Sequence, residues 1–190
     1  FGPAAHAELA LLLEVAGTPK PGNVDRTHDF ADLRFEQFLA GAVGGRPGLD
    51  AAADPDGPGV GRSFERAVAG MGQQEGGNTQ FGCLLLLVPL VRTAATGVLS
   101  RDRVERVVES TTVDDARAFF TAFDHVDVAV GDPPEGLDAL DARRGTDAGE
   151  AAATRDLTLF DVFLLSVPDD GNAAELVRGC PRAFRAADRM

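Results

Sequence analysis

The sequence predicts an all-α protein: a single-domain orthogonal bundle of about seven or eight helices around a central apolar helix. Along most of the chain, apolar residues recur at the i, i+3, i+4 and i+7 positions that define one face of a helix. Residues 81–95 are apolar on most sides, so we expect this helix at the centre, surrounded by the others. The alternation typical of a half-buried strand is not found convincingly anywhere in the chain.

The same spacing predicts where the individual helices lie. We expect helices near residues 5–16, 35–42, 64–71, 81–95, 100–108, 112–123, 156–166 and 172–188, the last continuing to the end of the chain. Thr112 and Asp115 have the spacing of a capping box, and Pro89 is expected to kink the central helix because it removes one backbone hydrogen bond.

Two segments interrupt the helical pattern. Residues 46–59 and 131–150 are rich in Gly, Pro and Asp and have no apolar periodicity, so both are predicted to be surface loops. Neither is flanked by a change in composition, and residues 1–190 are therefore treated as one domain. The sequence leaves open whether this domain is truncated at its termini, since it begins with Phe1 and not with Met.

The charge of the chain limits its partners. Thirty acidic residues face 18 basic ones, a net charge of -12 that argues against nucleic acid as a partner. No apolar run approaches the roughly 20 residues of a membrane span, so we expect no membrane partner and a cytoplasmic location. Arginine supplies 17 of the 18 basic residues, which suggests a salt-adapted proteome from a GC-rich genome. Codon bias alone is the alternative.

The segment between the first two predicted helices, residues 17–30, has the most potential for chemistry. It contains Lys20, the only lysine of the protein, flanked by Pro19 and Pro21 and followed by Gly22, which allows a turn. Polar and charged side chains follow within nine residues. They offer amide donors, an imidazole and carboxylates able to bind Mg²⁺ or a proton: Asn23, Asp25, Arg26, His28 and Asp29. The alternative is a solvated polar turn between two helices.

Two further segments are weaker candidates. Asn78 and Thr79 follow two glycines and precede the central helix, whose free N–H groups suit an anion, although a plain helix cap explains them equally well. Asp170 and Asn172 lie at the start of the last predicted helix, where acidic residues usually only satisfy the helix dipole.

Together these segments resemble one family, the triphosphoribosyl-dephospho-CoA synthases, and its archaeal branch in particular. Residues 11–30, LLLEVAGTPKPGNVDRTHDF, look like the family's N-terminal signature, and residues 76–87, GGNTQFGCLLLL, resemble its second motif. The matching positions of the first motif are Glu14, Lys20, Pro21, Gly22, Asp25, His28 and Asp29, and those of the second are Asn78, Thr79 and Gly82.

The resemblance implies an ATP-dependent transferase that moves a triphosphoribosyl group to dephospho-CoA or a related acceptor and releases adenine, in the synthesis of a prosthetic group. We expect Lys20 to contact a phosphate and Asp29, at the start of the second helix, to bind Mg²⁺ with His28 fixing its orientation. Glu14 is the candidate general base. The substrate-binding candidates are Pro21, Gly22, Asn23, Asp25, Asn78, Thr79, Gly82, Asp170 and Asn172.

Two other classes of function remain open from the residues alone. One is a non-catalytic helical nucleotide-binding or regulatory protein, which would bind ATP without releasing adenine. The other is a helical interaction protein that binds no nucleotide, in which arginine could replace Lys20.

Overall fold

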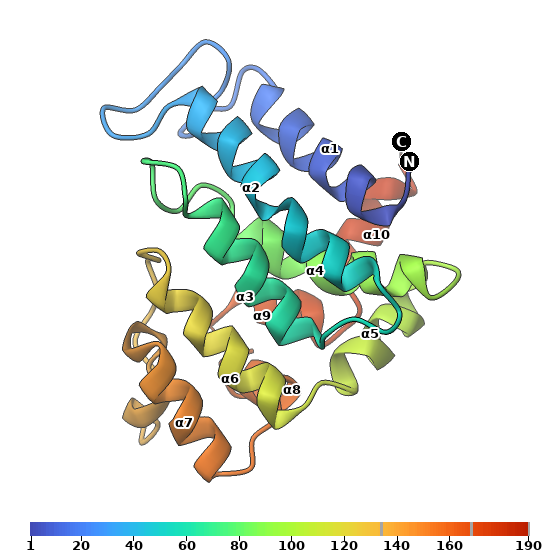
Figure 1. The fold of residues 1–190 in the computed structure, drawn as a ribbon, viewed down its shortest axis with the longest axis vertical. Helices are drawn as coiled ribbons and strands as arrows, with labels where there is room; N and C mark the ends of the chain where they lie inside the picture. Colours follow the sequence, from blue (N-terminus) through green and yellow to red (C-terminus); the bar gives the residue numbers. More distant parts are fainter. Residues whose placement is uncertain (134, 168, 190) are drawn as a thin grey trace.

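The computed structural model describes residues 1–133, 135–167 and 169–189. In these residues the chain forms ten α-helices and no strand, so the all-α prediction is confirmed (Figure 1). The first half contains α1 (Pro3–Ala16), α2 (Phe35–Ala53), α3 (Val60–Met71), α4 (Phe81–Ala95) and α5 (Arg101–Glu109). The second half contains α6 (Val113–Thr121), α7 (Thr146–Thr154), α8 (Leu159–Ser166), α9 (Gly171–Leu176) and α10 (Pro181–Ala187). Three 3-10 turns cover Ala122–Asp124, Asp138–Leu140 and Ala142–Arg144.

Helix α4 is the central helix that the sequence predicts. It contacts α1, α2, α3, α5 and α9, and its Leu84 and Val88 side chains are fully buried. Its apolar residues therefore have neighbours on most sides, which explains why this segment shows no polar face. The helix continues through Pro89 to Ala95.

Helices α2 and α3 pack closely because glycines meet at their contact. A Cβ atom at Gly44 would collide with the carbonyl oxygen of Gly70, and one at Gly70 would collide with the carbonyl oxygen of Gly44. The two backbones thus approach to a distance that no side chain permits. This pair supports the rest of the bundle, since both helices also pack against α4.

The prediction of a loop over residues 46–59 is wrong for its first half, because α2 continues to Ala53. Pro47 lies within this helix on its exposed side, while Gly48, Leu49, Ala51 and Ala52 are buried. The glycines and the proline that suggested a loop are therefore tolerated by helix packing. Only residues 54–59 remain as a connection.

The second predicted loop and the last predicted helix also need correction. Residues 131–150 contain two 3-10 turns and the start of α7, a helix that the sequence did not predict. The expected helix over residues 172–188 is two short helices, separated where Cys180 adopts a left-handed backbone with φ 57°. The helix ends at Ala187, and Met190 lies outside the described residues.

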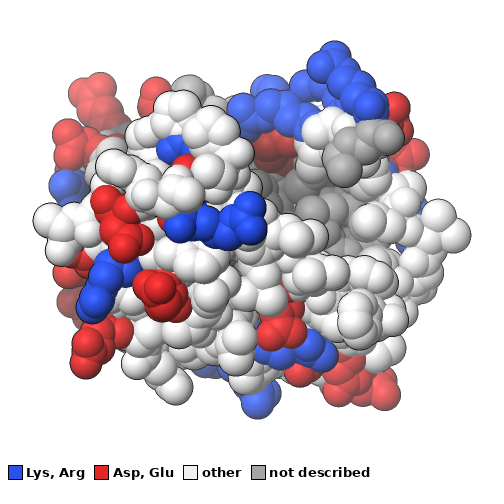
Figure 2. Space-filling model, turned by 90° about the horizontal axis from the view of Figure 1, so that it is seen from above, with Lys and Arg blue, Asp and Glu red and all other residues white. Residues whose placement is uncertain are grey.

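No helix in the described part of the chain is long and apolar enough to cross a membrane. On the face shown in Figure 2, acidic and basic side chains lie beside one another around a broad area without charge.

The capping box predicted at Thr112 is present: its hydroxyl accepts from the Asp115 N–H and the Asp115 carboxylate accepts from the Thr112 N–H.

Candidate active site

A tight turn holds Lys20 in place in the segment between α1 and α2. The Asn23 N–H donates to the Lys20 carbonyl at 3.0 Å, and Gly22 lies between them with φ +77°. Pro21 and Gly22 thus occupy the second and third positions of a type II turn, which favour proline and require a residue that tolerates positive φ. The Lys-Pro-Gly-Asn order is therefore explained by backbone geometry.

The buried carboxylate of Asp25 stabilises this turn through hydrogen bonds. One carboxylate oxygen accepts the Lys20 N–H at 2.9 Å, and the other accepts the N–H and the hydroxyl of Thr27, each at 2.8 Å. These hydrogen bonds, first from Thr27 and then from Lys20, lower the pKa of Asp25 below its usual value. Asp25 is buried, and both its carboxylate oxygens accept hydrogen bonds from this segment. We therefore interpret Asp25 as a residue that holds Lys20 in position.

A small apolar cluster anchors the segment to the bundle. Val24 is fully buried and packs with Val15 of α1 and Phe38 of α2. Its two neighbours in the sequence point elsewhere: Asn23 accepts the Val24 N–H, and Asp25 binds the turn. The segment is thus held on both sides of Val24, which makes Lys20 a fixed group on the protein.

The ammonium group of Lys20 is paired with Glu14. Its Nζ lies 2.6 Å from Glu14 Oε1 and is shielded from solvent, while the Glu14 side chain is 43 % exposed. A long cationic side chain is seldom buried unless it is paired. The turn therefore directs the only lysine inward, to the last turn of α1, and the two charges neutralise each other in this structure.

His28 and Asp29 lie further along the segment and are both exposed. Asp29 does not start α2, as the sequence suggested, because α2 begins six residues later at Phe35. Its Oδ1 atom nevertheless accepts the Phe35 N–H at 2.9 Å. The His28 ring packs edge-on against Phe30, at 6.0 Å between ring centroids, so the expected support of Asp29 by His28 is not present among the described contacts.

The turn before α4 combines a cap with buried polar groups. Asn78 accepts the Phe81 N–H through its Oδ1 at 3.1 Å, as the helix-cap alternative requires. The Thr79 hydroxyl and the Gln80 Oε1 atom are buried and have no hydrogen-bond partner among the described residues. Only four buried side-chain polar atoms in the described residues lack a hydrogen-bond partner. Lys20 Nζ is one of these four, although it forms an ion pair with Glu14. Buried polar atoms without a partner carry a cost in free energy, and two of them belong to consecutive residues of this turn.

The Lys20 turn and the start of α4 are neighbours in space. The Gln80 Nε2 atom donates to the Leu11 carbonyl in α1 at 3.3 Å. One turn further along α4, burial raises the pKa of the Cys83 thiol, the charge of Glu14 raises it further, and that of Lys20 lowers it. Figure 1 shows the segment after α1 and the turn between α3 and α4 on the same side of the molecule. The first two predicted motifs therefore meet at α4.

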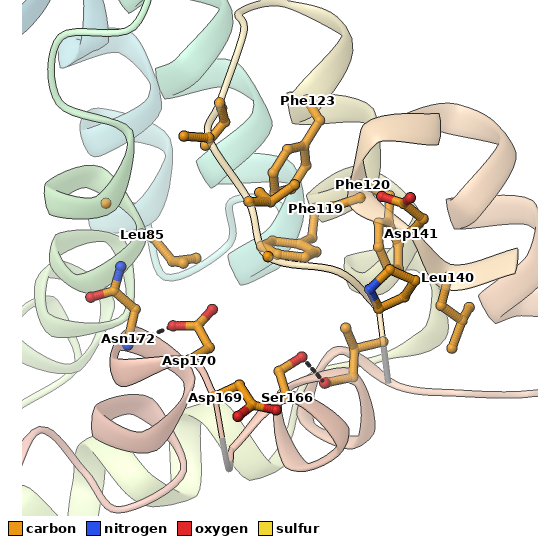
Figure 3. A pocket seen from close by; sticks show the side chains of 18 of the residues that line it. Leu85, Phe119, Phe120, Phe123, Leu140, Asp141, Ser166, Asp169, Asp170 and Asn172 are labelled. Carbon is orange, nitrogen blue, oxygen red and sulfur yellow. Dashed lines mark hydrogen bonds between the residues drawn. The ribbon is translucent and has the colours of Figure 1, made fainter. Parts of the chain in front are cut away.

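A cavity of about 480 Å³ opens beside the same end of α4. Its wall combines residues from α4, α6, α8 and the start of α9 with the segment 128–133. Figure 3 shows Leu85 facing Phe119 and Phe123 across the opening, with Asp170 and Asn172 at its edge. The Asp170 carboxylate also caps α9 by accepting the N–H groups of Asn172 and Ala173.

The cavity unites the second and third predicted motifs. Asn78 and Gly82 line it together with Asp170 and Asn172, and a Cβ atom at Gly82 would come within 3.1 Å of the Asn172 amide nitrogen. Gly82 thus leaves room for the Asn172 side chain beside α4. The Lys20 segment does not line this cavity, so the predicted residues form two adjacent groups at the start of α4.

The aromatic wall of the cavity was not predicted as part of a site. Phe119, Phe120 and Phe123 of α6 and its 3-10 extension line the cavity, although their spacing predicted only a helix face in the core. Among the described residues, the charged side chains in its lining are the aspartates at 132, 141, 169 and 170. Two of them, Asp132 and Asp141, pair with Arg143, which is not part of the lining. The sequence signal was ambiguous because a core face and a cavity wall have the same periodicity.

The chain matches a family model described as ATP:dephospho-CoA triphosphoribosyl transferase over residues 2–190. This all-helical protein is therefore a transferase. The protein belongs to the ATP:dephospho-CoA triphosphoribosyl transferase family, which confirms the resemblance seen in the sequence. No curated protein and no solved structure matches the chain.

Proposed function

We propose that this protein transfers the 5-triphosphoribosyl group of ATP to the 2′-hydroxyl of dephospho-CoA, or of a related acceptor, and releases adenine. The observation that carries the proposal is the position of Lys20, the only lysine: a rigid turn holds its shielded ammonium group 2.6 Å from Glu14 in the last turn of α1. The family match supports a transferase of this kind.

The reaction has simple requirements. The bond between ribose C1′ and the adenine nitrogen breaks, a bond from C1′ to the acceptor oxygen forms, the hydroxyl proton passes to a base and adenine takes up a proton. Catalysis requires a held triphosphate, a base for the hydroxyl proton, and negative groups near the positive charge that develops at C1′.

Lys20 and Glu14 meet two of these requirements through one exchange. A triphosphate oxygen that binds Lys20 replaces Glu14 as the partner of the ammonium, and the Glu14 carboxylate then becomes available to accept a proton. A pair of unit charges 4 Å apart is worth roughly 4 kcal/mol at an effective dielectric constant of 20. Contact of this kind keeps its value in concentrated salt, where long-range attraction between charges is screened.

Mg²⁺ would supply the charge neutralisation that ATP needs beside an acidic protein. In the described residues no three His, Cys, Asp or Glu side chains are arranged to hold a metal ion. Magnesium commonly uses one or two carboxylates together with phosphates and water, so Asp29, exposed and with one oxygen bound to the Phe35 N–H, fits this mode of binding. Asp29 would hold the ion at the edge of the Lys20 segment.

The test is an assay of purified protein with ATP, Mg²⁺ and dephospho-CoA in concentrated KCl. We expect free adenine and an acceptor product whose mass has increased by one triphosphoribosyl group, in equal amounts. ATP binding without adenine release under these conditions would favour the non-catalytic alternative. Adenine release without an acceptor product would show that water, and not dephospho-CoA, attacks C1′.

A further inference from the structure

The cavity beside α4 has features of a site for a flat, uncharged ring. Its volume of about 480 Å³ lies within the range of small-molecule pockets, which are mostly apolar with a few placed polar groups. Phe119 and Phe123 form one wall, with their ring centroids 5.4 Å apart and their planes nearly perpendicular, and Leu85 lies opposite (Figure 3). A planar ligand between these walls would contact apolar surface on both faces.

The charged side chains that line the same cavity disfavour a phosphate. Its described lining contains several aspartates and no cationic side chain. Asp141 stays ionised because the hydrogen bonds of Arg143 lower its pKa. A triphosphate placed here would face the carboxylates of Asp169 and Asp170, and the Arg143 cation is already paired with Asp132 and Asp141. Lys20 does not line this cavity and is paired with Glu14 of α1.

The polar groups at the edge of the cavity suit an amino-purine. Asn78 and Asn172 carry side-chain NH₂ groups that no described residue accepts from, and these can donate to ring nitrogens. The Asp170 carboxylate accepts hydrogen bonds and can take one from an exocyclic amino group. A purine with a 6-amino group offers this combination of acceptors and donor.

We infer that this cavity binds an adenine ring, through contact with the Phe119 and Phe123 rings, stacked on one and edge-on to the other, and through hydrogen bonds to Asn78, Asn172 and Asp170. The inference rests on the proposed function for its ligand, because ATP and dephospho-CoA both carry adenine. The phosphates of the nucleotide extend out of the cavity along the start of α4. Asn78 and Gly82 line the cavity at this point. The charges of Glu14 and Lys20 affect the pKa of the thiol of Cys83, the next residue along α4.

The test measures binding of adenosine, which has no phosphate, by calorimetry in concentrated KCl. Leu165 and Leu164 are neighbours on α8 with similar exposure, but only Leu165 lines the cavity. We expect Leu165→Trp to weaken adenosine binding at least tenfold and Leu164→Trp to leave it unchanged. Equal affinity in the two variants would overturn the inference.

A second variant addresses stacking. Phe123→Leu keeps an apolar side chain and removes one aromatic face, and we expect it to weaken adenosine by about five- to hundredfold, the range found for base stacking on aromatic residues. Inosine, with oxygen in place of the 6-amino group, should bind more weakly than adenosine to the parent. Adenosine binding unaffected by Phe123→Leu, or inosine binding as well as adenosine, would contradict the proposed contacts.

The source of the adenine is settled by competition. Displacement of adenosine by ATP but not by dephospho-CoA assigns the cavity to the donor, and the reverse assigns it to the acceptor. Both outcomes support an adenine site, and displacement by neither overturns it. Because these measurements need no turnover, failure of the transfer assay with adenosine binding intact would reject the proposed function and leave this site standing.

Discussion

Lys20 stands out among single residues, because the chain uses arginine at every other basic position. The turn that holds it is built from the Asn23–Lys20 backbone bond and from Asp25, none of which needs the ammonium group itself. Removing the side chain should therefore leave the fold intact. We expect Lys20→Ala to weaken ATP binding tenfold or more, about 1.4 kcal/mol, with almost no change in melting temperature.

Arg62 provides a matched control for this variant. It is an exposed cation on α3 whose ion pair joins it to Glu65 within the same helix, so Arg62→Ala removes one positive charge elsewhere. ATP affinity should be unchanged in that variant. If Lys20→Ala also bound ATP like the parent, Lys20 would have no part in the site.

Asp25 should make the Lys20 turn sensitive to acid. Its pKa is lowered in the folded protein, chiefly by the hydrogen bonds from Thr27 and Lys20, so the contribution of the carboxylate to stability is present above its unfolded pKa of about 3.9. That contribution is lost as the pH falls through the lower, folded value. We expect the melting temperature of Asp25→Asn to fall less steeply than that of the parent below about pH 4. Parallel curves would show that the carboxylate is not stabilised in this way.

A substitution at Asp29 distinguishes between two roles of this residue, that of a metal ligand and that of a cap of α2 alone. Asp29→Asn keeps an oxygen that can accept the Phe35 N–H and removes the negative charge. We expect the variant to fold with the parent's melting temperature but to need at least tenfold more Mg²⁺ for adenine release. Asp32→Asn, a nearby exposed carboxylate in the same segment, is the control. An unchanged Mg²⁺ requirement would leave Asp29 as a cap alone.

At the scale of the elements, the contact between α2 and α3 explains why a helix was mistaken for a loop. Gly44, Gly48 and Pro47 lower the helical signal of α2, yet the glycines lie where α3 approaches most closely. Intrinsic propensity alone predicts that replacing a helical glycine stabilises by up to about 1 kcal/mol. Because a side chain at Gly44 would collide with the Gly70 carbonyl, overpacking should dominate.

We therefore expect Gly44→Leu to destabilise the protein by about 1–3 kcal/mol, measured by denaturant unfolding. Val43→Leu, at the exposed neighbouring position, should have almost no effect. A Gly44→Leu variant as stable as the parent would show that α2 and α3 can separate at this contact without cost.

The elements most accurately predicted were those whose pattern depends on local sequence alone. The range of α4 follows from its apolar residues, and the capping box of α6 from the Thr112–Asp115 spacing. The break between α9 and α10 depends instead on a left-handed residue, Cys180, that is not a glycine, and the short α7 has few large apolar residues to mark its period. Such features are stabilised by tertiary packing, which periodicity does not encode.

In the candidate site, as in the helices, the sequence predicts local geometry but not the contacts between distant residues. The residue types of the Lys20 turn and its geometry follow from Pro21 and Gly22 in the sequence. Two contacts could not be predicted, because only the folded chain shows them. Lys20 pairs with Glu14, six positions earlier, and Asn172 lines the same cavity as Asn78, 94 positions earlier. The aromatic wall could not be distinguished from the core, since both bury the same face of α6.

At the scale of the whole molecule, a net charge of -12 should make stability depend strongly on salt. Most ion pairs join residues on the surface, where each is worth little, and they leave many carboxylates without a cationic partner in the described residues. Self-repulsion among like charges destabilises the compact state, and it weakens as the Debye length falls from about 10 Å at 0.1 M to about 3 Å at 1 M.

We expect the melting temperature to rise by roughly 4–8 °C between about 0.1 M and 1 M KCl, equivalent to about 2 kcal/mol for a chain of this size. Sucrose would act through exclusion from the surface without screening charge, so it serves as the solvent control. The matched protein control neutralises three exposed carboxylates that form no ion pair among the described residues: Glu109→Gln, Asp127→Asn and Glu135→Gln. If repulsion is the cause, this triple variant gains less from KCl than the parent while responding equally to sucrose. An equal gain from KCl in both proteins would place the salt dependence elsewhere, in apolar burial or in specific ion binding.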